Sequence, residues 1–527
     1  MKSKGRRIFF GLVVMLWLVV CVLGAAALLE FYPQYHQRSV ERTNRFVLAY
    51  RGFGRWPDLD DAGNPVMPDE TEVASVVEPP VETSPLFDHL GARFAQYSEE
   101  DRQTYAFLNE EVIAVYDRDG NNLGVYGTAE QAEALGVPAP AELAGKPLAD
   151  TPLATGGRDA LALIERVLES GLPESTAYDA QMAWGSALLE MHGYPIRNEA
   201  GEAAAVVVTL RNSTGLTLTE IKSREVQEVD SPMWLIPWVE YRKNARLSQK
   251  WSTNNVGFRD DDVILPKPAG VFRIACVGGS TTEEGFTNAT TYPNILEQKL
   301  NDHFAGDPPV EVINCGVVGL DSLGEKRRAL DFVRLEPDLI VEYNGVNDIC
   351  HALLPMWQKE WERDATDRQR RLRRSRFVVT YLNHLFWPDD AAMVAQLERS
   401  TMNSLRTMWE VIEKRNIAMG LCSFAYPDID NLSPEERDYY EWNVRTWWQG
   451  KYFNFATYCR LVRLYNQCVK ALCEQEGLLY VPLAEELKGG PAYFGDICHM
   501  RPKGIERKAE ILARHLKDYI ESQRGQS

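Results

Sequence analysis

The sequence lacks several features that would point to other classes of protein. Its nine cysteines include no Cys-x-x-Cys pair, which argues against a structural zinc site. Lys and Arg total 57 against 75 Asp and Glu, for a formal net charge of -18, whereas a nucleic-acid binder needs clustered positive charge to displace counterions from phosphates. At 527 residues, with 45% hydrophobic and 25% charged residues, we expect a globular protein of two or three domains.

The cysteines themselves fall into two groups. Cys276, Cys315 and Cys422 lie within apolar, strand-like runs, which favours small buried core residues. Cys350 and Cys498 each stand beside a polar motif near the end of such a run. A disulfide between these two is one hypothesis and a pair of free thiols is the other, because sequence alone does not fix connectivity.

A long uncharged run is present at the N-terminus, from Ile8 to Leu29, and it is long enough to cross a bilayer. We expect a transmembrane signal anchor at 8–29 with residues 1–7 as a cytoplasmic tail. The positive-inside rule supports this orientation, because the tail is basic at Lys2, Lys4, Arg6 and Arg7. The chain after Glu30 would then be extracytoplasmic (periplasmic), on a single-pass cell-membrane protein. The alternative is a cleaved signal peptide, with Ala25-Ala26-Ala27 as the cleavage site.

A stretch without Lys or Arg occupies residues 56–85 and contains six prolines and eight acidic residues. Such a composition cannot bury a core, so it predicts an extended, self-repelling chain. We therefore assign residues 30–103 to a linker that is acidic and proline-rich at 56–85.

Residues 104–216 predict a small α+β domain. Apolar strand runs occupy 112–116 and 123–126, with a tight-turn signal at Asp119-Gly120 between them. Helical periodicity follows through Ala160, Leu163, Ile164, Val167 and Leu168, and two further strand runs lie at 188–196 and 204–210.

This segment resembles a PAS domain, which would act as a ligand sensor, a homodimerisation module or a spacer. The matching stretches are Ala114 to Gly120, Leu143 to Leu148, Tyr194 to Gly201 and Leu210 to Thr214. The flavin-binding, light-sensing subclass is excluded because residues 104–216 contain no cysteine. Haem would need His192 as its axial ligand, and a lone histidine on a strand is more often structural. We therefore expect no cofactor.

After a connector at 217–250 that contains Trp234, Trp238 and Tyr241, residues 251–527 show the pattern of an α/β domain. Amphipathic helical segments separate five apolar strand runs, at 272–277, 310–313, 339–343, 417–424 and 478–483. The last helix carries Ile505, Ala509, Leu512, Leu516 and Tyr519 at helical spacing. Continuous apolar strands predict a parallel sheet covered on both faces, with ligand sites at the carboxyl ends of the strands.

Polar motifs follow three of those strands. Ser280 comes after Gly278-Gly279 and opens a predicted helix, whose N-terminus favours negative charge near the hydroxyl. Its alternative role is a helix N-cap, while a phosphate loop would need a Gly-Lys-Ser/Thr that is missing. Gly319 could offer a backbone N–H and Asn347 a side-chain amide to an oxyanion, although each could equally belong to a plain loop.

Asp496 and His499 stand three residues apart before the last helix, a spacing that lets the carboxylate orient an imidazole acting as base to a serine. A competing pair with the same spacing exists at Asp348 and His351. We favour the later pair, because it precedes an amphipathic helix whereas His351 begins a charged insert.

These motifs resemble those of the SGNH hydrolases, also called the GDSL family, over residues 250–522. The resemblance implies a three-layer α/β/α, flavodoxin-like domain with catalytic Ser280, Asp496 and His499. It also implies an oxyanion hole made of the Ser280 and Gly319 N–H groups and the Asn347 side chain. The chain has Gly-Gly-Ser where the family's namesake has Gly-Asp-Ser.

The resemblance also implies a serine esterase without cofactor or metal. Its substrate would be a small-molecule or glycan ester, such as an O-acetyl group on a cell-envelope glycan. The alternatives are an O-acyltransferase with the same triad and a PAS-based sensory protein with a vestigial hydrolase domain.

Two further segments leave their roles open. Residues 351–390 carry seven arginines between Arg363 and Arg376, which indicates a solvated helix face or a contact with a membrane or an anionic polymer. The second segment is aromatic and would either pack in the core or stack on sugars and cover the site, with Tyr439, Tyr440, Trp442, Trp447, Trp448, Tyr452, Phe453 and Phe455.

Overall fold

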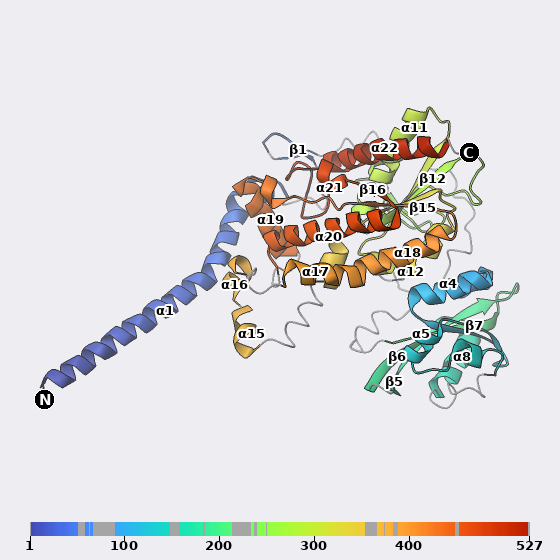
Figure 1. Ribbon diagram of the computed structural model, residues 1–527, viewed down its shortest axis with the longest axis horizontal. Helices are drawn as coiled ribbons and strands as arrows, with labels where there is room; N and C mark the ends of the chain where they lie inside the picture. Colours follow the sequence, from blue (N-terminus) through green and yellow to red (C-terminus); the bar gives the residue numbers. More distant parts are fainter. Residues whose placement is uncertain are drawn as a thin grey trace.

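A computed structural model describes residues 2–50, 58–62, 64–66, 90–147, 158–182, 185–212, 233–236, 240–248, 250–353, 366–373, 375–382, 388–447 and 453–524. One long helix projects from a body that contains two five-stranded sheets (Figure 1). The predictions for linker residues 51–57 and 67–89 and for Arg363, Arg374, Trp238, Trp448 and Tyr452 lie outside the described residues.

The larger domain is built on a parallel sheet. Its strands follow the predicted apolar runs, as β12 (Phe272–Gly278), β13 (Val310–Gly316), β14 (Leu339–Tyr343), β15 (Ala418–Cys422) and β16 (Leu479–Val481). Their order in the sheet is β13-β12-β14-β15-β16, and each neighbouring pair is parallel. This is the flavodoxin-like order, and its chain reversal falls beside β12. The predicted parallel α/β sheet is confirmed.

Helices cover both faces of this sheet (Figure 1). On one side lie α11 (Tyr292–Phe304) and α22 (Pro502–Arg524), which pack against each other. On the other side lie α12 (Ser322–Arg327), α18 (Asn403–Glu413) and α20 (Phe455–Glu476). The helical spacing of Ala509, Leu512 and Leu516 is confirmed, since all three are fully buried.

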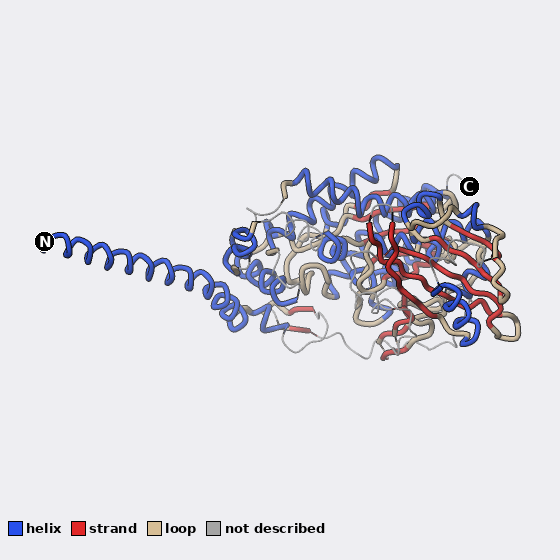
Figure 2. Tube along the Cα trace, turned by 90° about the horizontal axis from the view of Figure 1, so that it is seen from below, coloured by secondary structure: helices blue, strands red, loops and turns tan. Residues whose placement is uncertain are grey.

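The second sheet is antiparallel and has the order β4-β3-β7-β6-β5. Figure 2 shows its strands at the end of the molecule away from the projecting helix. They are β3 (Val112–Asp117), β4 (Asn122–Tyr126), β5 (Glu174–Met182), β6 (Gly185–Arg197) and β7 (Ala203–Asn212). The sequence missed β5, because this edge strand is half-exposed over 174–178 and carries no apolar run.

Helices flank this second sheet as well. Between β4 and β5 come α5 (Ala129–Ala134), α6 (Pro140–Leu143) and α8 (Arg158–Ser170), and α8 packs on β6 and β7. Helix α3 (Leu90–Gln96) contacts the same two strands, and α4 (Glu99–Asn109) lies between this sheet and the larger domain. Four ion pairs join α4 and its C-cap to the larger domain, Lys326–Glu110, Arg334–Asp101, Arg415–Asp101 and Arg415–Glu100.

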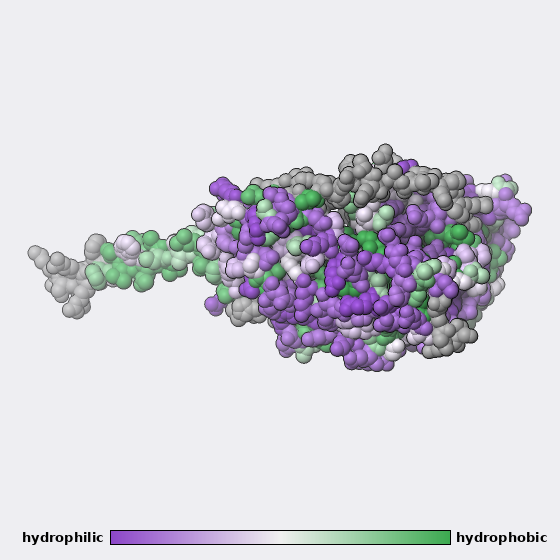
Figure 3. Space-filling view, turned by 90° about the horizontal axis from the view of Figure 1, so that it is seen from above, coloured by the Kyte–Doolittle hydropathy of each residue, from purple (hydrophilic) through white to green (hydrophobic). Residues whose placement is uncertain are grey.

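The projecting helix is α1 (Lys2–Thr43), and the part from Phe10 is long and apolar enough to span a membrane by length and composition. Its large apolar side chains are exposed, as the green surface in Figure 3 shows. A helix of this kind near the N-terminus is also compatible with a signal sequence.

The predicted linker at 30–103 needs correction at both ends. The end of α1, α2 (Arg45–Tyr50), α3 and α4 are ordered helices within it, and Val47 and Phe94 are fully buried. Within the acidic stretch, Asp58–Leu59 and Pro65–Val66 pair as a small hairpin of strands β1 and β2. These contacts were not predictable from the sequence, because each segment buries only a few residues against distant elements.

All nine cysteines are free in the structure. Cys276, Cys315 and Cys422 are buried, as predicted. The hypothesis of a disulfide between Cys350 and Cys498 is therefore wrong, and both residues are free thiols.

Candidate active site

Three predicted side chains meet at the carboxyl end of the parallel sheet. Ser280 begins the one-turn helix α10 (Ser280–Glu283) directly after β12. Its Oγ lies 2.8 Å from Nε2 of His499, and Nδ1 of that ring lies 2.7 Å from Oδ2 of Asp496. The chain thus forms a continuous hydroxyl–imidazole–carboxylate contact, with 219 residues separating the serine from the histidine.

Glycines allow α10 to sit directly against the strand ends. A Cβ on Gly278 would clash with the carbonyl oxygen of Tyr343, and one on Gly316 would clash with the backbone of Glu283. A Cβ on Gly279 would lie 2.5 Å from Nδ2 of Asn347. The Gly-Gly before the serine is therefore needed to bring the hydroxyl beside the asparagine amide.

The Asp496 side chain also shapes its own loop. Its Oδ1 accepts hydrogen bonds from the backbone N–H of Cys498 at 2.8 Å and of His499 at 2.6 Å. The loop is closed by a bridge between Phe494 and Met500. Because one carboxylate oxygen holds the backbone and the other holds the imidazole, the ring orientation is fixed by Asp496 twice.

Three buried tyrosines fix the same loop from outside. Tyr439 and Tyr440, on α19 (Pro434–Trp447), donate to the carbonyl oxygens of Gly495 and Phe494, and Tyr458, on α20, donates to Ile497. Tyr439, Tyr440, Trp442, Phe453 and Phe455 are all buried. Core packing is therefore the correct interpretation for these five, and sugar stacking by them is wrong.

The charges around His499 favour its protonated form. Burial is the largest single effect and lowers the pKa of His499, but the charge and hydrogen bond of Asp496 together with the charges of Glu284 and Glu283 raise that pKa to about 9. For Asp496, burial raises the pKa and the neighbouring His499 lowers it, with a net decrease. Each group therefore stabilises the ionised form of the other.

Asn347 lies beside the serine with its amide oriented by the backbone. Nδ2 donates to the carbonyl oxygen of Leu320 at 2.7 Å, and the residue is 3% exposed. An amide nitrogen carries two hydrogens, so this bond fixes the group and leaves one donor for another acceptor. Gly319 precedes Leu320 with a φ of 82°, a conformation that favours glycine.

The loop that carries Gly319 has a support that the sequence did not reveal. The Tyr241 hydroxyl accepts a hydrogen bond from the Val318 N–H at 3.1 Å. Tyr241 is buried between the rings of Trp234 and Trp251, with centroid distances of 4.6 and 5.2 Å. The expected connector at 217–250 thus contributes to the site, although its aromatic residues were the only sequence signal.

The competing aspartate has a different environment. Asp348 accepts hydrogen bonds from the hydroxyls of Ser322 and Thr401, at 2.5 and 3.0 Å. Burial raises the pKa of Asp348 to about 7. Its carboxylate therefore ties α12 to the segment before α18, while Asp496 occupies the position beside the imidazole that contacts Ser280.

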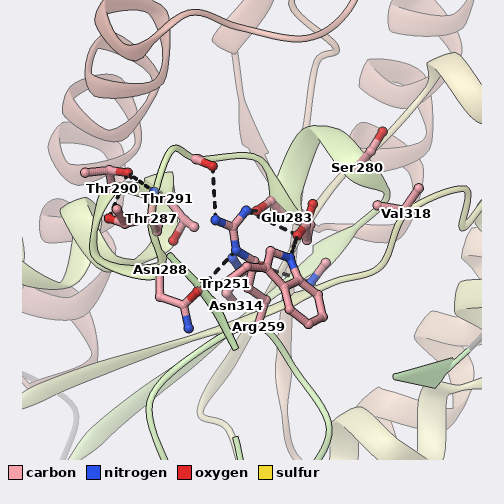
Figure 4. A network of polar contacts seen from close by, with 12 residues as sticks. Trp251, Arg259, Ser280, Glu283, Thr287, Asn288, Thr290, Thr291, Asn314 and Val318 are labelled. Carbon is pink, nitrogen blue, oxygen red and sulfur yellow. Dashed lines mark hydrogen bonds and ion pairs between the residues drawn. The ribbon is translucent and has the colours of Figure 1, made fainter. Parts of the chain in front are cut away.

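A buried network that no sequence motif indicated holds the turn of helix that begins at Ser280. Figure 4 shows the Arg259 guanidinium and the Trp251 indole converging on Glu283, on the same turn as Ser280. Arg259 donates to the carboxylate of Glu283 at 3.2 Å and to its carbonyl oxygen at 2.9 Å, and Trp251 donates to that carboxylate at 2.6 Å. This network therefore fixes α10 through both the side chain and the backbone of Glu283.

A buried ion pair links the serine and histidine segments from beneath. Lys508 on α22 is fully buried, and its Nζ donates to Glu284 at 2.8 Å and to the Thr281 carbonyl oxygen at 2.7 Å. Glu284 also accepts from the Met500 N–H at 2.8 Å. Burial raises the pKa of Glu284 and lowers the pKa of Lys508, and each partner opposes the shift of the other. The pair thus connects the residue after Ser280 with the residue after His499.

Replacing Lys508 with methionine is expected to lower the free energy of unfolding by about 3–5 kcal/mol, because Glu284 then remains buried without its cation. The double variant Glu284→Leu with Lys508→Met should regain most of that loss. Urea unfolding followed by tryptophan fluorescence measures both. The control Lys517→Met, on the same helix, should change stability by at most about 0.5 kcal/mol. An unchanged midpoint for Lys508→Met would contradict the role of the pair.

One group of potential metal ligands lies in this loop. The ligand atoms of Asp496, Cys498 and His499 are within 4.8 Å of one another, and the thiol lies 3.4 Å from Nδ1 of the ring. However, Nδ1 already pairs with the carboxylate of Asp496, and burial raises the pKa of the Cys498 thiol. The arrangement therefore suits an acid–base pair better than a cation.

Comparison with known proteins gives one family. A family model described as the GDSL-like Lipase/Acylhydrolase family matches residues 276–507. No curated protein matches the chain.

Three solved structures are similar to part of this chain, each at low sequence identity. A lipolytic protein of the G-D-S-L family from Desulfitobacterium hafniense is 12% identical, with 46% of this chain and 98% of that chain covered and a TM-score of 0.28. An acetylxylan esterase from Geobacillus stearothermophilus is 16% identical, with 46% of this chain and 93% of that chain covered and a TM-score of 0.31. A GDSL-like lipase from Bacteroides thetaiotaomicron is 14% identical, with 48% of this chain and 88% of that chain covered and a TM-score of 0.27.

Proposed function

We propose that Ser280, His499 and Asp496 are the catalytic triad of this protein. Residues 276–507 match the GDSL-like lipase/acylhydrolase family, and the protein is a carboxylic ester hydrolase. The observation that carries this proposal is the pair of contacts at the imidazole, 2.8 Å to the serine hydroxyl and 2.7 Å to the carboxylate. Such an arrangement provides a nucleophile, a general base and a group that orients the base.

In the proposed reaction, Nε2 of His499 takes the proton of Ser280 as Oγ attacks the ester carbonyl carbon. The imidazolium that forms is stabilised by Asp496 and then gives its proton to the departing alcohol. An acyl-serine remains. Water attacks it with His499 again acting as base, and the carboxylic acid leaves while the proton returns to Oγ.

We assign the developing oxyanion to three donors, the N–H groups of Ser280 and Gly319 and the Asn347 amide. Support comes from the amide, which the carbonyl oxygen of Leu320 holds beside Gly279. A donor fixed before the reaction costs no reorganisation when charge develops.

For the substrate we propose a short-chain ester, such as an O-acetyl group on a cell-envelope glycan. The His499 side chain is 25% exposed and Ser280 is half-buried, so the reacting atoms are accessible from the surface. This placement suits an ester carried on a bulky polymer.

We further propose that α1 is retained as a single-pass membrane anchor, with the hydrolase domain extracytoplasmic (periplasmic). The support is that the C-terminal part of α1 and α2 belong to the packed body. Asn44 donates to the carbonyl oxygen of Glu435 at 2.9 Å, and Trp442 donates to Glu41 at 3.2 Å. These contacts attach the polar end of α1 to the hydrolase domain, so a retained α1 would hold this domain beside the membrane.

We propose that residues 104–216 are a PAS-like module, held against the hydrolase domain by the ion pairs of α4. The environment of His192, the one histidine in this segment of the sequence, does not favour a role as a haem ligand. His192 is 4% exposed, and its Nε2 lies 3.2 Å from the guanidinium of Arg211. The structural role predicted for this histidine is the one we retain.

Replacing Asn347 with alanine is expected to lower kcat about 10²- to 10³-fold with little change in KM, because an oxyanion donor acts mainly in the transition state. The assay uses the full-length protein on para-nitrophenyl esters from acetyl to dodecanoyl. We expect the acetyl ester to give the highest kcat/KM.

Asn301→Ala is the matched control for this variant. That amide also donates to a backbone carbonyl, of Val310 at 2.7 Å, but at the opposite edge of the sheet. It should cost stability without loss of kcat. Unchanged turnover in Asn347→Ala would rule out its assigned role, and a preference for dodecanoyl would rule out the short-chain substrate.

A further inference from the structure

Specific contacts set the position of the basic helix α15 (Asp367–Arg373) relative to the end of the apolar run in α1. The run ends at Leu29, and the carboxylate of Glu30, the next residue, accepts a hydrogen bond from the Ser375 hydroxyl at 3.0 Å. The rings of Tyr32 and Tyr381 lie 6.5 Å apart, which places α16 (Arg376–Tyr381) along α1. Residue 375 is therefore level with the first polar residue after the apolar segment.

Helix α15 (Asp367–Arg373) ends only two residues before Ser375. Its sequence, DRQRRLR, holds four arginines and one acid, and every side chain described from 366 to 372 is exposed. In Figure 1, α15 extends beyond α16 on the side of the body from which α1 projects. The basic helix thus lies next to the boundary between the apolar and polar parts of α1.

Such a position has an electrostatic consequence if α1 spans a bilayer. The exposed apolar residues of α1, such as Trp17 at 67% and Leu28 at 71%, would lie in hydrocarbon, so the headgroup layer would begin near Glu30. Arginines at that depth are attracted to anionic lipids. The chain as a whole carries a formal net charge of -18 and would be repelled by the same surface. A basic helix at this level is therefore complementary to an anionic membrane where the rest of the chain is not.

We propose that α15 binds the anionic phospholipid headgroups of the membrane that α1 enters, and so fixes the orientation of the hydrolase domain above that surface. The inference rests on the proposed membrane anchoring. Rigid coupling follows from the packing already described, because α16 and α19 both contact α1, and α19 carries Tyr439 and Tyr440, which hold the Asp496 loop.

The test uses the full-length protein in nanodiscs of phosphatidylcholine alone or of phosphatidylcholine mixed with phosphatidylglycerol. Amide hydrogen exchange in peptides covering 366–373 should be about tenfold slower in the anionic discs, and high salt should remove the difference. The double variant Arg368→Glu with Arg371→Glu should lose this lipid dependence. The control, Lys414→Glu with Lys470→Glu, reverses two exposed lysines on α18's C-cap and on α20 and should keep it.

The outcomes separate the two proposals. Protein that stays in the discs but exchanges equally in both lipids overturns the headgroup contact and leaves the anchor intact. Protein that does not remain with the discs overturns the anchor and, with it, the contact. Equal protection in phosphatidylcholine discs by added soluble polyphosphate would replace the lipid with an anionic polymer and so overturn the lipid assignment.

Discussion

Replacing Ser280 with alanine is expected to lower kcat for ester hydrolysis about 10⁶-fold, because the attacking oxygen is removed and no acyl-enzyme can form. His499→Ala should cost about as much, since the serine then has no base. The measurement is kcat of the full-length protein on para-nitrophenyl acetate, with the thermal unfolding midpoint recorded for each variant.

The double variant is the sharper part of this experiment. Residues that act as a unit are strongly non-additive, so Ser280→Ala with His499→Ala should be no slower than either single variant within about tenfold. Additive losses would mean that the 2.8 Å contact does not act as a catalytic unit.

A second serine at the carboxyl end of the sheet controls for the loss of a hydroxyl at this position. Ser423 follows β15 at the same edge of the sheet and donates to Glu485 at 2.5 Å. Ser423→Ala should therefore keep kcat within about tenfold while changing stability by a few kcal/mol at most. If it fell as far as Ser280→Ala, the loss would reflect damage to the strand ends rather than chemistry.

Replacing Asp496 with asparagine is expected to lower kcat about 10⁴-fold and to move the pH profile. His499 acts as a base only when neutral, and its pKa is raised to about 9. In the unmodified protein, kcat/KM should therefore rise as the pH increases through about 9. Burial lowers this pKa and Asp496 is the largest cause that raises it, so its removal should shift the rise to lower pH.

Asp348→Asn is the appropriate comparison, because it removes the carboxylate of the competing Asp-x-x-His pair. Asp348 contacts Ser322 and Thr401. Its loss should therefore leave the rise in kcat/KM where it was. A shift in Asp348→Asn and none in Asp496→Asn would reverse the assignment of the two pairs.

The parallel sheet and the residues at its carboxyl edge were predictable from short-range patterns. Each strand of this sheet is an apolar run, and a helix-period segment follows it, so the parallel direction of the strands follows from general rules. Ser280 and Asn347 then lie at one edge because parallel strands all end there. Asp496 and His499 needed only their spacing and the helix that follows.

Other parts of the site gave weak local signals. Tyr241 lay in a presumed connector, Tyr439 in a segment equally compatible with a lid, and Arg259 on no motif at all. Tyr241 and Tyr439 each form a hydrogen bond with the backbone of a distant loop, and Arg259 donates to the carboxylate and the carbonyl oxygen of Glu283. A single polar residue forms no periodic pattern, so its hydrogen-bond partner cannot be predicted from the sequence around it.

Hydrophobic periodicity and motif spacing are local properties of a sequence, so they were sufficient to predict the fold class, the resemblance to the GDSL family and the side chains that we propose as reactive. The burial of Lys508 against Glu284, the three tyrosines that hold the Asp496 loop and the packing of residues 30–50 with the hydrolase domain appear only in the folded chain. Those contacts join residues up to several hundred positions apart. Their energy comes from burial and pairing, which exist only once the chain has folded.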